Sequence, residues 1–108
     1  QLKNMIPHLL AKWQQSIGVQ VEAWGVKRMK TRWGTCNPKA RRIWLNLELA
    51  KRPLHCLEYV IVHELVHLLE QSHNARFTGF MDQFMPLWRQ HREELRQPQH
   101  GQPSEWGE

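Results

Sequence analysis

The feature that most constrains the fold is an apolar segment, residues 57–69, that carries two histidines and a glutamate near its centre. Apart from Glu58, its only strongly polar residues are His63, Glu64 and His67, so it predicts a helix buried on nearly all sides. Residues four apart share a helix face, so His63 and His67 can direct their imidazoles at one point, with Glu64 beside them. Burying these groups costs free energy unless they are paired or bind a metal.

The spacing of these residues is HExxH. Two neutral imidazoles on one helix face can hold Zn²⁺, and the carboxylate between them can take a proton from water and give it to a leaving group. The motif therefore predicts a zinc-dependent hydrolase in which His63 and His67 bind the metal and Glu64 is the general acid and base. The alternative interpretation is a pair of core histidines that are hydrogen-bonded to backbone carbonyls.

A catalytic zinc usually has three protein ligands and keeps one position for water. We expect His73 to be the third ligand, because it follows His67 in a polar stretch where the helix ends and the chain turns back. The competing ligand is a glutamate on the following helix, either Glu93 or Glu94. Glu70, one turn beyond His67, either orients a ligand imidazole or lies solvated at the helix end.

The rest of the chain predicts a single α+β domain. An amphipathic N-terminal helix closes at Gly18, and Pro7 places its start near Asn4 or Met5. Three segments then alternate apolar and polar residues, as strands do: residues 19–23, 29–35 and 43–47. We expect a small, mostly antiparallel three-stranded sheet with one charged face, followed by the HExxH helix with Pro53 in its first turn.

After His73, an apolar stripe rich in Phe and Met predicts a C-terminal helical segment that packs on the core. Pro86 interrupts the stripe, so either one helix kinks there or a second helix begins with Pro86 in its first turn. Residues 97–108 are rich in Pro, Gln and Gly, and we expect them to form a flexible tail after one domain at residues 1–96. The start at Gln1, without an initiator methionine, is compatible with a fragment of a longer protein.

Charge is unevenly distributed along the chain, whose formal net charge is +5. Nine basic residues, against the single acid Glu48, fall between residues 27 and 52: Lys27, Arg28, Lys30, Arg32, Lys39, Arg41, Arg42, Lys51 and Arg52. A basic stripe beside a metal site suits a phosphate-bearing or acidic substrate, or a nucleic acid. The alternative is a solvated cationic face.

The two cysteines, Cys36 and Cys56, are expected to be free thiols in a reducing cytoplasm, because the chain does not open with a signal peptide. No apolar run approaches the length of a membrane span. We therefore expect a cytoplasmic protein without membrane contact.

The order of the motifs resembles that of the YgjP-like family of small metal-dependent hydrolases, relatives of the SprT-like and WLM metallopeptidase domains and of the minigluzincins. The resemblance covers residues 27–95 and rests on five segments: Arg32-Trp33-Gly34-Thr35-Cys36, Ile43-Trp44-Leu45-Asn46, the residues from Tyr59 to His67, His73-Asn74-Ala75-Arg76-Phe77, and Met85-Pro86. It implies a zincin-like minimal domain and a metallopeptidase-like activity, although one branch of the family is described as hydrolysing nucleoside triphosphates.

The resemblance also implies that zinc is held by His63, His67 and His73, with Glu64 as general acid and base. Where the family usually has Asn-His-Ser, this chain has Ser72-His73-Asn74, which leaves the local turn open.

Substrate contacts are predicted for Trp33, Gly34 and Arg32. An extended substrate can pair with the sheet edge above the metal, and a glycine there lets the two backbones approach. The alternative is a buried tryptophan and a glycine that relieves twist. The oxyanion of the reaction has four candidate partners: Arg32, Arg76, His91 and Tyr59.

Three functions stay open at this point. The first is a zinc metallopeptidase that acts on a peptide or protein. The second is a nucleoside triphosphate hydrolase whose arginines and lysines hold the phosphates, although the chain has no glycine-rich phosphate loop. The third is a binding module with structural zinc, closed by a fourth ligand such as Cys36, Glu70 or Glu93.

Overall fold

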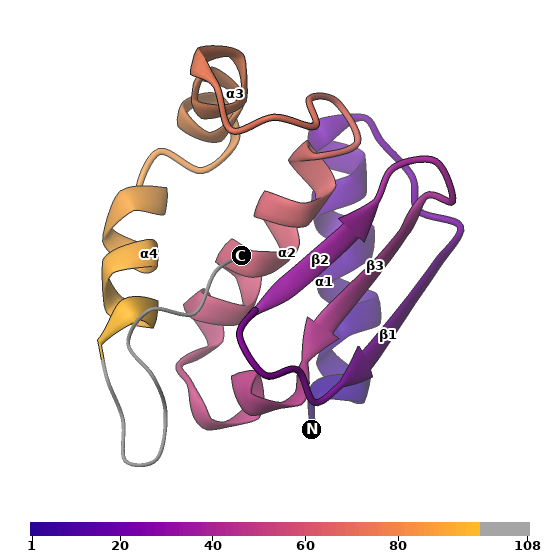
Figure 1. The fold of residues 1–108 in the computed structure, drawn as a ribbon, viewed down its shortest axis with the longest axis vertical. Helices are drawn as coiled ribbons and strands as arrows, with labels where there is room; N and C mark the ends of the chain where they lie inside the picture. The colour runs from indigo at the N-terminus through magenta and orange to yellow at the C-terminus, as the bar shows by residue number, and fades with distance from the viewer. Residues whose placement is uncertain (98–108) are drawn as a thin grey trace.

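The computed structural model describes residues 1–97. Its elements are α1 (Leu2–Ile17), β1 (Ala23–Lys27), β2 (Gly34–Asn37), β3 (Arg42–Asn46), the 3₁₀ helix η1 (Leu47–Lys51), α2 (Leu54–Val66), α3 (Ala75–Phe84) and α4 (Trp88–Arg96). Figure 1 shows the sheet in front of α1 and α2, with α4 on the other side of α2 from the sheet. The predicted α+β fold is confirmed. The predicted tail lies outside the described residues, apart from Gln97.

The first helix starts earlier than predicted, at Leu2, so Pro7 lies inside it. Pro7 lacks the N–H of a regular helical bond, but buried Leu2 and Ile6 anchor these first turns in the core. The helix ends at Gly18 as predicted. Gly18 is left-handed, with φ of 83°, and its N–H donates to the Gln14 carbonyl over 2.9 Å.

The sheet is mixed, where the sequence predicts a mostly antiparallel one. Its strand order is β1–β3–β2, so β3 lies between the other two strands. β3 is antiparallel to β2, its neighbour in the chain, and parallel to β1. Alternation of apolar and polar residues locates strands and their faces, but it does not state which strands pair.

The strand limits also differ from the prediction. The first strand is predicted at residues 19–23, but β1 begins at Ala23 and continues through Gly25. Gly25 fits there because the Trp44 ring of β3 lies over it, and a Cβ at this position would overlap that ring. The second predicted strand is regular only from Gly34 onward. The residues before it form a loop that the buried Asn46 holds, since its side-chain amide donates to the carbonyls of Met29 and Arg32 over 3.1 and 2.7 Å.

The central helix α2 is the middle of the core, and its side chains from Tyr59 to Val66 are all buried, as the sequence predicts. It packs against α1, β2, β3, α3 and α4. Helices with the length and apolarity needed to span a membrane are absent from residues 1–97.

Two helices, α3 and α4, follow instead of one kinked helix, and Pro86 lies between them. Arg52 ties the end of α4 to the rest of the domain. Its Nη1 donates to the carbonyls of Leu95 and Gln97 over 3.1 and 3.0 Å, and its guanidinium lies over the Trp33 ring at 5.0 Å. The position of α4 therefore depends on a buried charge as well as on apolar packing.

Candidate metal centre and active site

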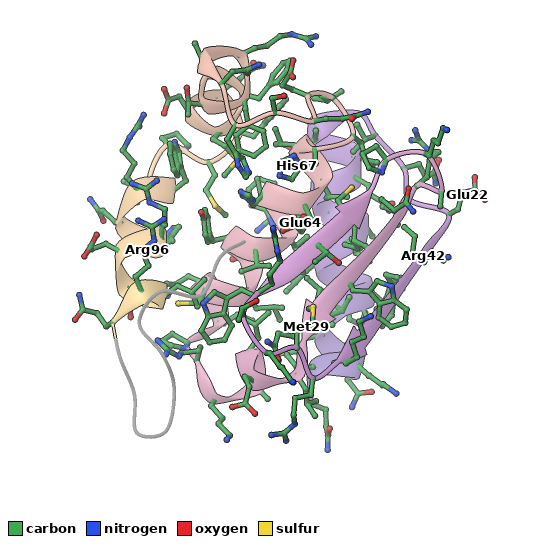
Figure 2. All side chains as sticks on the ribbon, in the orientation of Figure 1. Glu22, Met29, Arg42, Glu64, His67 and Arg96 are labelled. Atoms are coloured by element: carbon green, nitrogen blue, oxygen red, sulfur yellow. The ribbon has the colours of Figure 1, made fainter. Side chains whose placement is uncertain are left out.

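Three histidines meet at the C-terminal end of α2. His63 lies in its last turn, His67 caps it, and His73 lies in the loop before α3. One ligand atom from each lies within 4.8 Å of the others, and the Nε2 atoms of His67 and His73 are 3.0 Å apart. No other group of three such side chains could hold a metal in the part of the chain that the structure describes. Figure 2 shows His67 and Glu64 on α2, between β2 and α4.

The backbone fixes the orientation of His67. Just after α2 the chain tightens, and the Glu70 carbonyl lies 3.2 Å from Nδ1 of His67. If Nδ1–H donates to this carbonyl, Nε2 carries its lone pair toward His73. The backbone carbonyl of Glu70 therefore orients the imidazole of His67. The sequence alone offers the Glu70 side chain as a candidate for this role.

The loop that carries His73 is held at both ends. The Glu70 carboxylate accepts from the Ser72 N–H over 3.2 Å and from Arg76 over 3.1 Å. Asn74 caps α3, because its side-chain oxygen accepts from the Phe77 N–H over 3.0 Å. The Phe77 ring then lies against all three histidine rings, with centroids 4.7 to 5.0 Å away. This aromatic contact was not anticipated from the sequence.

The environment keeps two of the imidazoles neutral. Burial, together with the charges of His67, His73 and Arg92, lowers the pKa of His63 well below its ordinary value of 6.5. Burial, followed by the charge of His73, lowers the pKa of His67. A neutral imidazole is the form that binds a metal, so this environment favours ligation near pH 7.

The three histidines fit zinc. Two nitrogens at about 2.0–2.1 Å from a tetrahedral Zn²⁺ lie about 3.3 Å apart, close to the 3.0 Å between the Nε2 atoms of His67 and His73. Nδ1 of His63 is buried and has no hydrogen-bond partner among residues 1–97. The fourth ligands that a structural site would need, Cys36, Glu70 or Glu93, are not in the group. Three neutral ligands suit a site that keeps a position for water.

Glu64 is 1% exposed and lies beside the histidines, with Oε2 3.8 Å from Nδ1 of His63. β2 crosses α2 at this point. A Cβ on Gly34 would lie 2.7 Å from Cγ1 of Val60 and 3.1 Å from Oε2 of Glu64. The glycine is therefore required by the contact between strand and helix, without any appeal to substrate.

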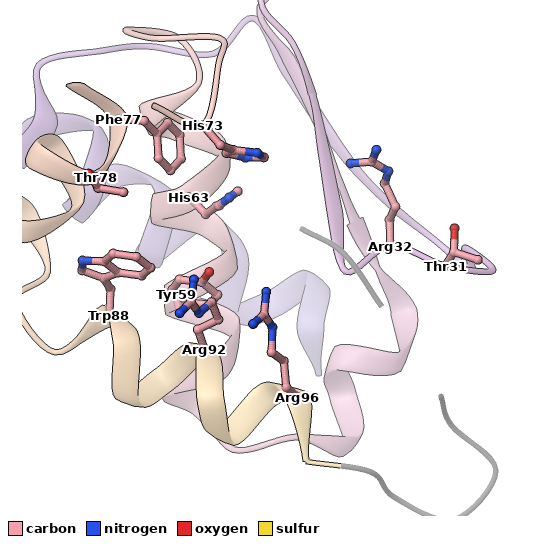
Figure 3. Close-up of a pocket in the computed structure, with 10 residues that line it drawn as sticks. All are labelled: Thr31, Arg32, Tyr59, His63, His73, Phe77, Thr78, Trp88, Arg92 and Arg96. Atoms are coloured by element: carbon pink, nitrogen blue, oxygen red, sulfur yellow. The ribbon is translucent and has the colours of Figure 1, made fainter. Parts of the chain in front are cut away.

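Two clefts open at the histidines. The α4 cleft, of about 550 Å³, is lined by His63 and His73 together with Tyr59, Phe77, Trp88 and three arginines: Arg32, Arg92 and Arg96. The β2 cleft, of about 450 Å³, is lined by Glu64, His67 and His73 together with Thr35, Cys36, Pro38, Gln71 and Arg32. Figure 3 shows His63 and His73 between Arg32 on one side and Phe77 and Trp88 on the other. His73 and Arg32 line both clefts.

The predicted substrate contacts separate in the structure. Arg32 lines both clefts, and Gly34 lies against Glu64. The Trp33 ring is only 1% exposed and packs under Arg52, so its surroundings are those of a core residue.

The oxyanion candidates separate as well. Tyr59 and Arg32 line the α4 cleft. Arg76 pairs with Glu70 over 3.1 Å, and His91 packs against His55. Neither residue lines the α4 cleft or the β2 cleft.

The competing metal ligands lie elsewhere. Glu94 contacts His55 over 2.6 Å, and Glu93 is exposed on α4. Neither glutamate lines the α4 cleft or the β2 cleft.

Both cysteines are free, as the sequence predicts. Cys36 lines the β2 cleft, where burial and the charge of Glu64 raise its pKa to about 12. In this environment the side chain is a thiol, so Cys36 does not offer a thiolate nucleophile.

Sequence reasoning missed two of the arginines at the site. Of the nine basic residues between 27 and 52, Arg32 alone lines these clefts, and the other two cleft arginines, Arg92 and Arg96, come from α4. A signal was present, because Trp88, Arg92 and Arg96 are spaced by four residues and share a helix face. A search for apolar periodicity assigns such arginines to a solvated face.

The chain is similar to one described protein family and to two solved structures. A model of the family described as YgjP-like, metallopeptidase domain matches residues 1–98. The metallopeptidase zymogen abylysin of Pyrococcus abyssi shares the fold with a TM-score of 0.75 and 18% identity, over 83% of this chain and 90% of that one. The metallopeptidase zymogen jannalysin of Methanocaldococcus jannaschii does so with a TM-score of 0.64 and 21% identity, over 74% and 81%.

No curated protein sequence matches the chain. At these identities the two solved structures establish a shared fold. The family model spans nearly the whole sequence, and the chain therefore belongs to the YgjP-like metallopeptidase domain family.

Proposed function

We propose that this protein is a zinc-dependent metallopeptidase that hydrolyses a bond within a peptide or protein. The observation that carries the proposal is the meeting of His63, His67 and His73 beside the buried carboxylate of Glu64, where two clefts open. Membership of a metallopeptidase family supports it.

The three imidazoles would hold Zn²⁺, which supplies a Lewis acid for the scissile carbonyl and lowers the pKa of a water ligand. Glu64 takes the proton of the attacking water and delivers it to the leaving amine nitrogen. Its burial keeps bulk water from competing for that proton. Tyr59, whose ring centroid is 5.8 Å from that of His63, and Arg32 line the cleft where negative charge develops on the carbonyl oxygen.

The substrate lies along the outer edge of β2. β2 is at the end of the strand order and pairs with β3 on one side only. Thr35 and Cys36 of this strand line the β2 cleft. An extended peptide that adds to this edge passes the histidines and continues into the α4 cleft.

The proposal is tested with zinc-loaded protein and a mixture of unstructured peptides, with products identified by mass spectrometry. Glu64→Gln keeps the shape of the side chain and the three histidines, so it should retain zinc. It should lose hydrolysis by a factor of about 10² to 10⁴, the usual contribution of a general acid and base. Unchanged peptide hydrolysis in Glu64→Gln would remove Glu64 from the mechanism.

A parallel assay with nucleoside triphosphates tests the reaction class. Phosphate release that depends on Glu64, with every peptide left intact, would replace the peptidase by a phosphohydrolase.

A further inference from the structure

The side chains that line the α4 cleft carry an excess of positive charge. Its lining contains Arg32, Arg92 and Arg96, and no aspartate or glutamate among the described residues. The β2 cleft differs, because its lining contains the Glu64 carboxylate, and the shared Arg32 is the only arginine of residues 1–97 that lines it. The positive charge is therefore concentrated on one side of the histidines.

Within the described part of the chain, two of these arginines, Arg92 and Arg96, lack the carboxylate partners that Arg76 and Arg89 have. Arg76 pairs with Glu70 over 3.1 Å, and Arg89 pairs with Asp82 over 2.7 Å. Within residues 1–97, neither Arg92 nor Arg96 forms an ion pair with a carboxylate. Nε of Arg92 is buried and has no hydrogen-bond partner among these residues. A desolvated guanidinium donor without an acceptor is costly, so the site favours an anion.

The Arg92 side chain and the backbone that carries Arg96 are also held in place. The Arg92 guanidinium lies over the Trp88 ring at 5.0 Å, and the Trp88 Nε1–H donates to Asp82 over 2.8 Å. The carbonyl end of α4, next to Arg96, is tied down by Arg52. Figure 3 shows Arg32 on a separate wall from Arg92 and Arg96. A planar guanidinium group, such as that of Arg92, can bind a carboxylate through two parallel hydrogen bonds.

We propose that the α4 cleft binds a carboxylate of the substrate, held by Arg92 and Arg96 with Arg32 opposite. Because the cleft adjoins His63 and His73, this carboxylate belongs to a residue close to the cleaved bond. It is either the side chain of an aspartate or glutamate or the free C terminus of the peptide. The inference rests on the proposed peptidase function and adds a substrate class to it.

The test measures binding by the zinc-loaded Glu64→Gln protein, using fluorescence anisotropy of short labelled peptides of one background sequence. The reference peptide contains glutamine and has an amidated C terminus. One arm replaces glutamine by glutamate at each position in turn, and the other frees the C terminus. At least one arm should bind about tenfold to a hundredfold more tightly than the reference, as expected for hydrogen bonds to a charged group. The arm that does so identifies the source of the carboxylate.

The arginines are tested in the same background. Arg92→Gln and Arg96→Gln should each remove most of this preference, and Arg92→Lys should keep part of it, because the charge remains while the planar fork is lost. Arg89→Gln is the matched control, since Arg89 is on the same helix but lines neither cleft, and it should keep the full preference. Equal binding of all peptides, or a preference that survives both glutamine variants, overturns the inference.

The two proposals fail separately. Peptide hydrolysis by the wild type without any preference for a carboxylate would sustain the peptidase and overturn the cleft assignment. Arginine-dependent binding of the carboxylate peptides, with no peptide cleaved by the wild type, would sustain the cleft assignment and overturn the peptidase.

Discussion

Gly34 sets how closely the sheet can approach Glu64. It is buried, and a Cβ at this position would enter the space of Val60 and of the Glu64 side chain. The carboxylate that the mechanism needs is thus enclosed by a strand backbone on one side and by its own helix on the other. The same contact limits the freedom of Glu64 to leave the histidines.

Gly34→Ala should lower the free energy of unfolding by about 1–3 kcal/mol, the usual effect of overpacking in a core. It should also reduce hydrolysis, because the added methyl group displaces Glu64. Thermal denaturation measures the first effect and peptide cleavage the second. Gly79→Ala is the control, since a Cβ there meets nothing within 4 Å, and alanine in place of a helical glycine should stabilise the protein slightly. A Gly34→Ala protein as stable and active as the wild type would contradict this packing.

At the scale of elements, some parts of the site can be predicted from the sequence and others cannot. The positions of His63, Glu64 and His67 are predictable because helical spacing fixes where their side chains lie relative to one another. His73 is predictable because it follows His67 closely in the chain. The parallel pairing of β1 with β3 is not predictable from the sequence, since it depends on how the connection between these two strands folds back. The presence of Arg92 and Arg96 at the site is not predictable either, because the packing of α4 on α2 brings them to the cleft that His63 and His73 line.

The position of α4 rests on Arg52, which donates to two carbonyls at its C-terminal end. Arg52→Met keeps the apolar stem but removes these charged hydrogen bonds, so it should lower the free energy of unfolding by about 1.5–3 kcal/mol. Urea denaturation measures this loss, and hydrogen exchange should show that α4 opens more readily than α1. Arg28→Met is the control, because Arg28 is a mostly exposed residue that pairs with Glu48, and it should change stability by less than about 0.5 kcal/mol. Equal effects of the two substitutions would contradict the role of Arg52.

At the scale of the whole molecule, the buried histidines make stability depend on pH when no metal is bound. The folded-state pKa values of His63 and His67 lie below the ordinary value of 6.5, so the unfolded chain binds more protons in the interval between. The free energy of unfolding therefore rises with pH through this interval and falls as the pH is lowered through it. His91 contributes in the same direction.

With zinc removed by a chelator, the protein should be less stable at about pH 5.5 than at about pH 7.5, by up to about 1.4 kcal/mol per pH unit for each histidine. Denaturant titrations at a series of pH values measure the slope. His63→Gln should make the slope shallower, because it removes one of the groups. Constant stability across this range would mean that the two rings are hydrated.

The central claim is that His73 completes the metal site with His63 and His67. Zinc affinity, measured by competition with a chromophoric chelator, tests it most directly. His73→Ala should bind zinc far more weakly than the wild type, because two imidazoles from one helix do not fix a catalytic geometry. His91→Ala should bind zinc normally, since His91 packs against His55 outside both clefts. Wild-type affinity in His73→Ala, with zinc lost in Glu93→Ala or Glu94→Ala, would contradict the account.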